Sequence, residues 1–85
     1  MPIISNFYGI IIFMFWRDHN PPHFHAKYGE YEITVEIETG NVVGTMPSRA
    51  LQMIQEWRML HKKELIDNWR RAKQNKHLLK IKPLE

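Results

Sequence analysis

The stretch of the sequence best equipped for chemistry is DHNPPHFHA, residues 18–26, which places three histidines, an aspartate and an asparagine around a double proline. The whole chain has five histidines, so more than half of them fall in this segment. Imidazole and carboxylate groups can ligate a metal ion or move protons when they lie close together. The segment therefore predicts a metal or catalytic site, or else a rigid turn whose histidines bond to the backbone.

A metal site is one interpretation of these residues. His23 and His25 lie two residues apart, so on a strand they would project from one face with their Cα atoms about 7 Å apart. That spacing suits two ligands of one zinc or nickel ion, with His19 as a third ligand and Asp18 as a ligand or an orienting partner. The H-x3-H-x-H spacing is not diagnostic and a fourth ligand is missing. We therefore expect no bound transition metal and no cofactor.

Two other interpretations remain open for the same residues. In the first, His23 or His25 is a general base acting on RNA, and Arg17 stabilises the charge of a phosphate. In the second, the double proline fixes a turn, the proline that follows Asn20 holds it extended, and each histidine bonds a backbone group. The sequence does not separate these alternatives.

The two halves of the chain differ in charge. Residues 1–45 carry two basic and five acidic side chains, a net charge of −3, whereas residues 46–85 carry ten basic and four acidic ones, a net charge of +6. Such asymmetry favours an electrostatic partner, either RNA or an acidic protein, although a solvated basic helix surface is an equal alternative. The residues expected to bind such a partner are Asp18, His19, Asn20, Arg58, Lys62, Arg70 and Arg71.

The first half of the chain predicts strands. Phe7–Trp16 is rich in isoleucine and aromatic residues, which predicts a central strand buried on both faces. His23–Tyr28 predicts a second strand, and Tyr31–Glu38 alternates strictly between apolar and polar residues, as a strand with one buried face does. A turn at residues 39–41 leads into Val42-Val43 and predicts a hairpin.

The second half predicts helices. A helix is expected to begin at Pro47 or Ser48, and its apolar stripe continues to Leu60. The period slips around His61, which gives either one bent helix or two helices. The fold class is α+β: an antiparallel sheet of three to four strands, then two C-terminal helices or one bent helix on one face, with a possible short terminal strand. We expect one domain over residues 1–85, with strands at 7–45, helices at 48–75 and a tail at 76–85. The expected sheet–helix core is Phe13, Phe15, Ile33, Val35, Ile37, Ile54 and Trp57.

Composition excludes several classes of protein. The chain has no cysteine, so disulfides, thiolate zinc sites and cysteine nucleophiles are ruled out. The longest apolar run has ten residues, well short of the roughly 20 that span a bilayer, and it lacks the features of a signal peptide. We expect a cytoplasmic protein that does not contact membranes. A chain of 85 residues buries only a modest core, so a homodimer is also expected.

Four segments of the chain carry a family resemblance: MPIISNFYGIII, DHNPPHFHAKYGEYEITVEIETGNV, SRALQMIQEW and HKKELIDNWRRAKQNKHLLKIKP. They are similar to a small bacterial family registered only as a domain of unknown function, number four thousand one hundred and sixty. The resemblance covers essentially the whole chain, and HNPPHFHA is its most specific part. Members are commonly encoded beside a second small uncharacterised domain, as in toxin–antitoxin pairs, but the resemblance implies no catalytic residues.

The resemblance implies that the chain is an interaction module of a two-gene operon whose partner is the product of the neighbouring gene. A toxin-like ribonuclease that uses the histidine segment for acid–base chemistry is the first alternative. A small histidine-ligated metal protein is the second.

Overall fold

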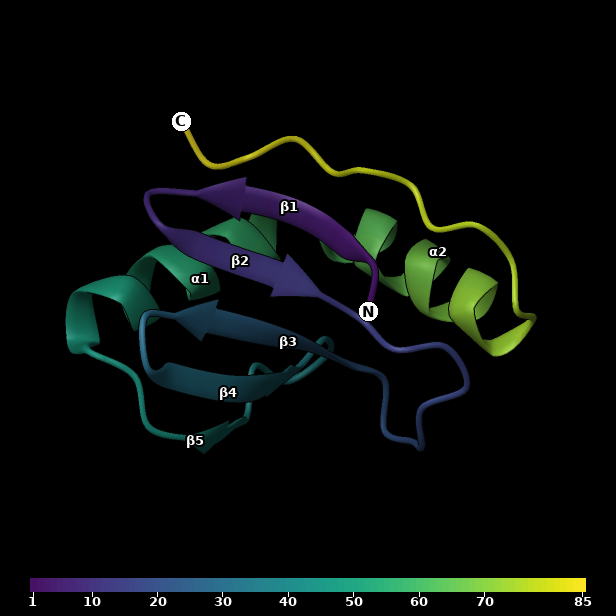
Figure 1. Cartoon of the computed structure of the whole chain (residues 1–85), viewed down its shortest axis with the longest axis horizontal. Coiled ribbons are helices and arrows are strands. Elements are labelled where there is room, and N and C mark those ends of the chain that lie inside the picture. Colours follow the sequence, from purple (N-terminus) through teal and green to yellow (C-terminus); the bar gives the residue numbers. More distant parts are fainter.

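The computed structural model describes all of residues 1–85 and shows a five-stranded antiparallel sheet followed by two helices (Figure 1). Each strand pairs with the next one in the sequence, in the order β1-β2-β3-β4-β5. The α+β class and the two C-terminal helices are confirmed, and the sheet has one strand more than the largest number expected. The elements are β1 (Ile3–Phe7), β2 (Ile10–Phe13), β3 (His23–Tyr28), β4 (Tyr31–Glu36), β5 (Val42–Gly44), α1 (Ser48–Leu60) and α2 (Lys62–Lys73).

The apolar segment Phe7–Trp16 does not form one strand, so that prediction is wrong. Tyr8 and Gly9 have φ angles of 50° and 82°, and two consecutive residues with positive φ form the tight turn that suits a β-hairpin. The chain reverses there and Phe7 pairs with Ile10. Periodicity missed the turn because the apolar run continues through it and because tyrosine rarely adopts a positive φ. The sheet consequently begins at residue 3 and not at residue 7.

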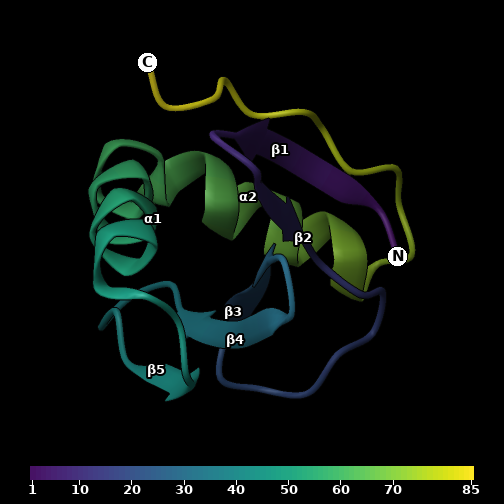
Figure 2. The same ribbon diagram turned by 60° about the vertical axis from the view of Figure 1, so that its left-hand side comes forward.

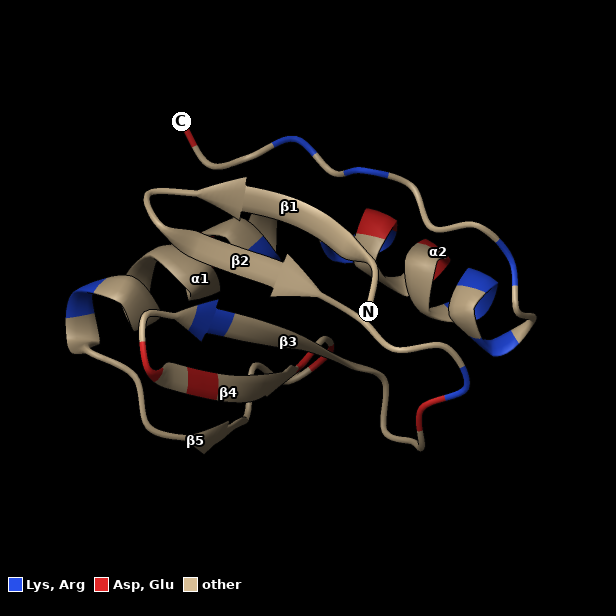
Figure 3. Cartoon of the chain, in the orientation of Figure 1, with Lys and Arg blue, Asp and Glu red and all other residues tan.

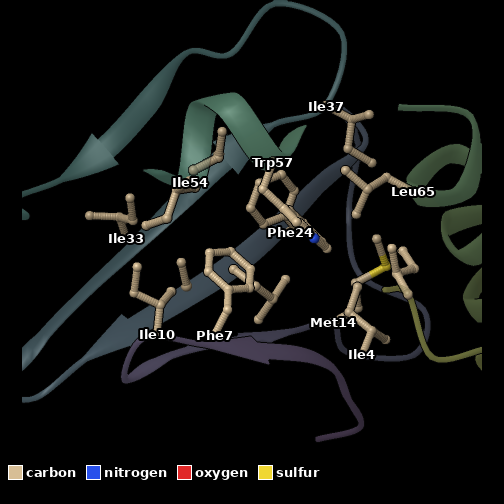
Figure 4. Packing of buried hydrophobic residues seen from close by; sticks show 14 of the residues in the cluster. Ile4, Phe7, Ile10, Met14, Phe24, Ile33, Ile37, Ile54, Trp57 and Leu65 are labelled. Carbon is tan, nitrogen blue, oxygen red and sulfur yellow. The ribbon is translucent and has the colours of Figure 1, made fainter. Parts of the chain in front are cut away.

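The hydrophobic core lies between the sheet and the two helices, which occupy the same side of it (Figures 1 and 2). Trp57 of α1 is fully buried at the centre of this core (Figure 4). The centre of its ring lies 5.5 Å from that of Phe7 and 5.7 Å from that of Phe24. Its indole Nε1 donates a hydrogen bond to the carbonyl oxygen of Lys82 at 2.9 Å. One side chain thus joins the sheet, α1 and the C-terminal tail.

The predicted core is partly correct. Ile33, Val35, Ile37, Ile54 and Trp57 are all buried in it, as expected. Phe13 and Phe15 were assigned to it wrongly: Phe13 is buried but lies outside the core cluster, and Phe15 is 41% exposed. Ile12 and Met14 take the inward positions. A shift of one residue along a strand exchanges the two faces, and the apolar run gave no polar residue to fix the register.

The helical region is divided at His61, whose φ of −125° and ψ of 25° are not helical, so the two-helix alternative is the correct one. Arg58 was expected to bind a charged partner but is buried in α1. Its guanidinium donates from Nη1 to the carbonyl oxygen of Ile37 at 2.7 Å and from Nε to Gln55 at 2.8 Å. The arginine thus satisfies the carbonyl group of Ile37, the residue that follows the end of β4. Neither helix is long and apolar enough to cross a membrane.

The C-terminal tail lies along the outer edge of β1 without forming a strand (Figure 1). The backbone N–H of Ile81 donates to the carbonyl oxygen of Ile4 at 2.8 Å. Asn68 of α2 holds the tail on the other side: its Nδ2 donates to the Leu79 carbonyl at 2.8 Å, and its Oδ1 accepts from the Leu79 N–H at 2.9 Å. The tail therefore covers the edge of β1, and β5 is the free edge of the sheet.

We predict that Trp57→Ala lowers the free energy of unfolding by about 3–5 kcal/mol, because it leaves a large cavity in a small core. Trp57→Phe should cost less, with about 1 kcal/mol arising from the lost bond to Lys82. Urea denaturation followed by circular dichroism measures both. Leu60→Ala is the matched control, since this side chain on the same helix is 66% exposed and should change stability by less than about 0.5 kcal/mol. A loss below about 1 kcal/mol for Trp57→Ala would contradict the packing described here.

Asn68→Ala should release the tail from α2, because it removes both hydrogen bonds to Leu79 and leaves those backbone groups without partners. We expect faster amide hydrogen exchange at Ile81 and earlier proteolytic cleavage within residues 76–85. Asp67→Ala is the control, since Asp67 is exposed on the same helix and bonds only to Arg71. Equal exchange at Ile81 in both variants would show that the tail is held by other contacts.

Candidate functional site

The loop between β2 and β3, residues 14–22, folds against the C-terminal end of α2. Three bonds hold it there: the N–H of Arg17 donates to the Ala72 carbonyl at 3.2 Å, Trp16 Nε1 to the Lys76 carbonyl at 2.9 Å, and Lys73 Nζ to the Asp18 carbonyl at 2.8 Å. A helix C-terminus leaves carbonyl groups without partners inside the helix, and the loop satisfies some of them. The backbone of Asp18 is fixed in place as a result.

On the sheet side, the loop covers aromatic residues of the outer face, which is the face opposite the helices. His25 stacks on Phe13, its partner across β2 and β3, with ring centres 5.1 Å apart and an angle of 16° between the rings. Phe15 packs edge-on against His25 at 4.8 Å. His23 lies two residues before His25 on the same face of β3. The centre of its ring is 5.2 Å from that of Trp69 in α2. Each histidine ring is therefore fixed by a neighbouring aromatic ring.

Asp18 joins three histidines into one group, which we call the histidine cluster: Asp18, His19, His23 and His25. Its Oδ2 lies 2.9 Å from His23 Nε2 and 3.2 Å from His25 Nε2. Its Oδ1 accepts from the backbone N–H of His19 at 2.9 Å and lies 3.0 Å from that residue's Nδ1. The Asp18, His23 and His25 side chains are between 10% and 16% exposed, whereas that of His19 is 86% exposed. The carboxylate thus binds the two enclosed rings through one oxygen and the exposed ring through the other.

The second nitrogen of each enclosed ring has a different environment. His23 Nδ1 lies 2.8 Å from the carbonyl oxygen of Pro21, which can only accept, so a hydrogen bond between them requires the hydrogen on Nδ1. His25 Nδ1 is buried and has no hydrogen-bond partner. His23 is therefore held from both sides, and the double proline supplies one of the two bonds. The structural interpretation of the sequence has support in this bond, because a histidine does bond the backbone of the turn.

The Asp18 carboxyl has a lowered pKa. Burial, the largest influence, raises the pKa, but the hydrogen bonds from His25 and from the backbone of His19, together with the charge and hydrogen bond of His23, outweigh it. The pKa of this carboxyl consequently lies below its usual value of 3.8. Asp18 is an anion at neutral pH, and it can act as a ligand or as the acceptor that fixes the two rings.

A groove of about 350 Å³ opens beside the histidine cluster on the outer face of the sheet. Thr34, Glu36, Asn41 and Val43 line it from the side of β4 and β5. Glu36 gives this wall an acidic side chain, and Figure 3 marks acidic residues of β4 in red on the ribbon. Asp18, His23 and His25 each offer a ligand atom here, and these atoms lie within 4.8 Å of one another. They are the residues that could hold a metal ion.

The other residues expected to bind a partner are dispersed. Arg17 and Asn20 lie in the loop beside the histidine cluster. Lys62 Nζ donates a hydrogen bond to the carbonyl oxygen of Glu38 at 3.3 Å and does not contact the histidine cluster. Figure 3 marks basic residues in blue at the C-terminal end of α2, beside the loop. Arg70 is exposed in α2, and Arg71 Nε lies 3.0 Å from Asp67 Oδ2. Arg58, being buried, offers no charge to a ligand.

Residues 9–70 match the profile of a family described as a domain of unknown function (DUF4160). The chain belongs to this family. The matched range of DUF4160 includes the whole histidine cluster, β3 and Trp69, and it excludes all of β1, the last three residues of α2 and the tail. No curated protein and no solved structure gives a significant match.

The DUF4160 chain has a second concave surface, which the sequence interpretation missed. The two hairpin turns at one end of the sheet carry the tyrosines: Tyr8 in the first turn, and Tyr28 and Tyr31 as cross-strand partners flanking the second (Figure 1). Beside them lies a groove of about 560 Å³. We call it the tyrosine groove; its lining includes Tyr8, Tyr28, Pro47, Arg49, Met53 and Leu84.

A sequence signal for this groove exists. Tyr8-Gly9 and Tyr28-Gly29 both place a tyrosine directly before a glycine with positive φ. In a sheet whose consecutive strands are antiparallel, the first and third turns lie at the same end. The Tyr-Gly pairs in the β1–β2 and β3–β4 turns therefore predict neighbouring tyrosines. The Tyr28 ring packs against Gly9, where a Cβ atom would lie 3.4 Å from Tyr28 Cε1.

The lowered pKa of Asp18 predicts a pH dependence of stability. Because the folded-state pKa lies below the unfolded one, the stabilisation is complete above about pH 4 and is lost as the pH falls through the folded-state pKa. Thermal melts of wild type between pH 2 and pH 6 should therefore show a steeper acid-side loss than those of Asp18→Asn. Asp67→Asn is the matched control and should follow the wild-type slope. Parallel curves for wild type and Asp18→Asn would contradict the assigned role of the carboxylate.

Proposed function

We propose that this chain is a protein-interaction module of a two-gene, toxin–antitoxin-like pair, and that it binds its partner at the tyrosine groove. The observation that carries the proposal is the gathering of exposed aromatic side chains around this one groove. Tyr8, which is 61% exposed, and Tyr28, which is also exposed, line the groove, and the exposed Tyr31 is the cross-strand partner of Tyr28. The identity of the partner as the neighbouring gene's product rests on the family resemblance.

The composition of the groove fits a protein partner. Tyrosine, methionine and arginine are enriched at protein interfaces, and tyrosine and arginine are frequent among the residues that dominate binding energy. Tyr8, Tyr28, Arg49 and Met53 represent all three types in one open surface. Tyrosine supplies a large contact area at a small cost in side-chain entropy, because it has only two rotatable bonds. A self-associated homodimer would cover the same surface and is the alternative occupant.

The histidine cluster gives less support to the ribonuclease alternative. Acid–base catalysis by His23 or His25 requires a ring nitrogen that can reach the substrate. Each Nε2 faces Asp18, His23 Nδ1 faces Pro21, and His25 Nδ1 is buried. Catalysis with Arg17 at the phosphate would therefore require Asp18 to release one of the rings. Glu32 and Glu36 alternate with the buried Ile33 and Val35 along β4, and their negative charges would also repel RNA.

Several broader expectations belong to the same proposal. A module that acts on a partner made from the same operon would work in the cytoplasm. RNA remains the alternative partner for the basic side chains of α2. Both follow from the charge pattern and the resemblance.

Co-expression with the product of the adjacent gene tests the proposal, followed by calorimetric titration of the purified partners. We expect a stoichiometric complex whose Kd rises about 30-fold for Tyr8→Ala and for Arg49→Glu, since a central aromatic or arginine side chain typically contributes about 2 kcal/mol. Val43→Ala is the matched control, because Val43 is exposed at the far edge of the sheet. Equal affinity in all variants, or no complex, would overturn the proposal. A homodimer that Tyr8→Ala dissociates would favour the alternative occupant.

A further inference from the structure

The hydrogen atoms of the His23–Asp18 pair cannot be placed satisfactorily on a neutral ring. The Pro21 carbonyl and the Asp18 carboxylate both only accept, so the single hydrogen of a neutral His23 can serve only one of them. The tautomer that can ligate a metal through Nε2 has this hydrogen on Nδ1. His23 Nε2 then directs a lone pair at Asp18 Oδ2, which is 2.9 Å away and also electron-rich. Two acceptors at this distance repel each other, and a cation between them would remove the repulsion. That cation is either a second proton on the ring or a metal ion.

We propose that Asp18, His23 and His25 form a binding site for one divalent first-row transition-metal ion of the zinc class. Each residue offers one ligand atom within 4.8 Å of the others, and the two short contacts of Asp18 Oδ2 indicate His23 Nε2 and His25 Nε2 as the nitrogen ligands. Two nitrogens and one carboxylate oxygen suit zinc and its first-row neighbours better than calcium or magnesium, which prefer oxygen alone. The ion is bound from one side and faces the groove on the outer face of the sheet.

The distances fit a single ion. Ligands about 2.0–2.1 Å from a tetrahedral zinc lie about 3.3 Å from one another. Asp18 Oδ2 lies 2.9 Å from His23 Nε2 and 3.2 Å from His25 Nε2, so both of these distances are already close to that spacing. Three protein ligands with an open fourth position are typical of sites that bind water or a substrate at the metal. The groove beside Thr34 and Glu36 supplies this open side.

The surrounding bonds hold the ligands as in known metal sites. A histidine that ligates a metal almost always donates its other N–H to a backbone carbonyl or a carboxylate, and His23 Nδ1 does so to Pro21 at 2.8 Å. Asp18 Oδ1 is occupied by His19, so Oδ2 is the oxygen left for the ion. Lys73 fixes the Asp18 backbone, and the aromatic stack with Phe13 fixes His25. These bonds position the ligands in advance.

The environment of His25 limits the affinity. When His25 Nε2 ligates an ion, its remaining hydrogen lies on Nδ1, which is buried and has no acceptor. Leaving a buried donor unpaired is unfavourable. We therefore expect a dissociation constant for Zn²⁺ in about the micromolar range, weaker than that of structural zinc sites.

Isothermal titration of chelator-treated, full-length protein with Zn²⁺ at pH 7 tests the proposal, and Co²⁺ absorption spectra report on the ligand geometry. We expect one equivalent per chain, a rise in melting temperature with Zn²⁺, and an affinity reduced about 100-fold in His23→Gln and in His25→Gln. His77→Gln is the matched control, because His77 is exposed in the tail, and it should bind as wild type does. Circular dichroism confirms that each variant is folded.

Three results would overturn the proposal: no saturable uptake by wild type, uptake that His25→Gln and Asp18→Asn leave unchanged, or nitrogen NMR showing both His23 nitrogens protonated with excess Zn²⁺ present. The last result would assign a proton to the space between His23 and Asp18. If His23→Gln does not fold, the Zn²⁺ affinity of Asp18→Asn provides the test in its place. The site lies at the opposite end of the sheet from the tyrosine groove, so loss of partner binding and loss of metal binding can be distinguished.

Discussion

The fold depends on the burial of Trp57 more than on any other contact. Its ring contacts Phe7 of β1 and Phe24 of β3, so one side chain packs two strands against α1. It also contacts His61, where α1 ends and α2 begins, and its Nε1 holds the tail at Lys82. A small domain has few residues that can be fully buried, so a single large aromatic side chain accounts for much of the apolar area removed from water. The positions of α2 and the tail follow from this packing.

The placement of α2 in turn determines the chemistry of the β2–β3 loop. At the C-terminal end of the helix, the Ala72 carbonyl accepts a hydrogen bond from the N–H of Arg17, and Lys73 Nζ donates one to the Asp18 carbonyl. Without this support, a nine-residue connection with two prolines would leave the carboxylate free to rotate. The opposite end of the sheet has no such cover, and its two turns leave aromatic side chains in solvent. The two ends therefore differ in kind: one encloses polar groups, and the other exposes apolar ones.

The sequence predicted the regular parts of the fold well because their periodicity is strong. β3 and the α1 start at Ser48 were predicted at the residues where they occur, and the strict alternation from Tyr31 located β4. The first hairpin was missed because Tyr8 occupies a positive φ angle that sequence pattern does not favour. The spacing of His23 and His25 predicted that they share a face, but the convergence of Asp18 on both rings could not be predicted. It depends on contacts with α2 that lie more than fifty residues away in the sequence.

The sealed edge of β1 has a consequence for assembly. With the tail along β1, only β5 can accept a strand from another molecule, and each chain therefore has a single free sheet edge. Two copies that join through this edge use up both free edges, so growth stops at a pair. Sheets with two open edges can instead extend without limit into fibrils. Because Asn68 holds the tail beside β1, association of chains through their sheet edges would stop at two copies.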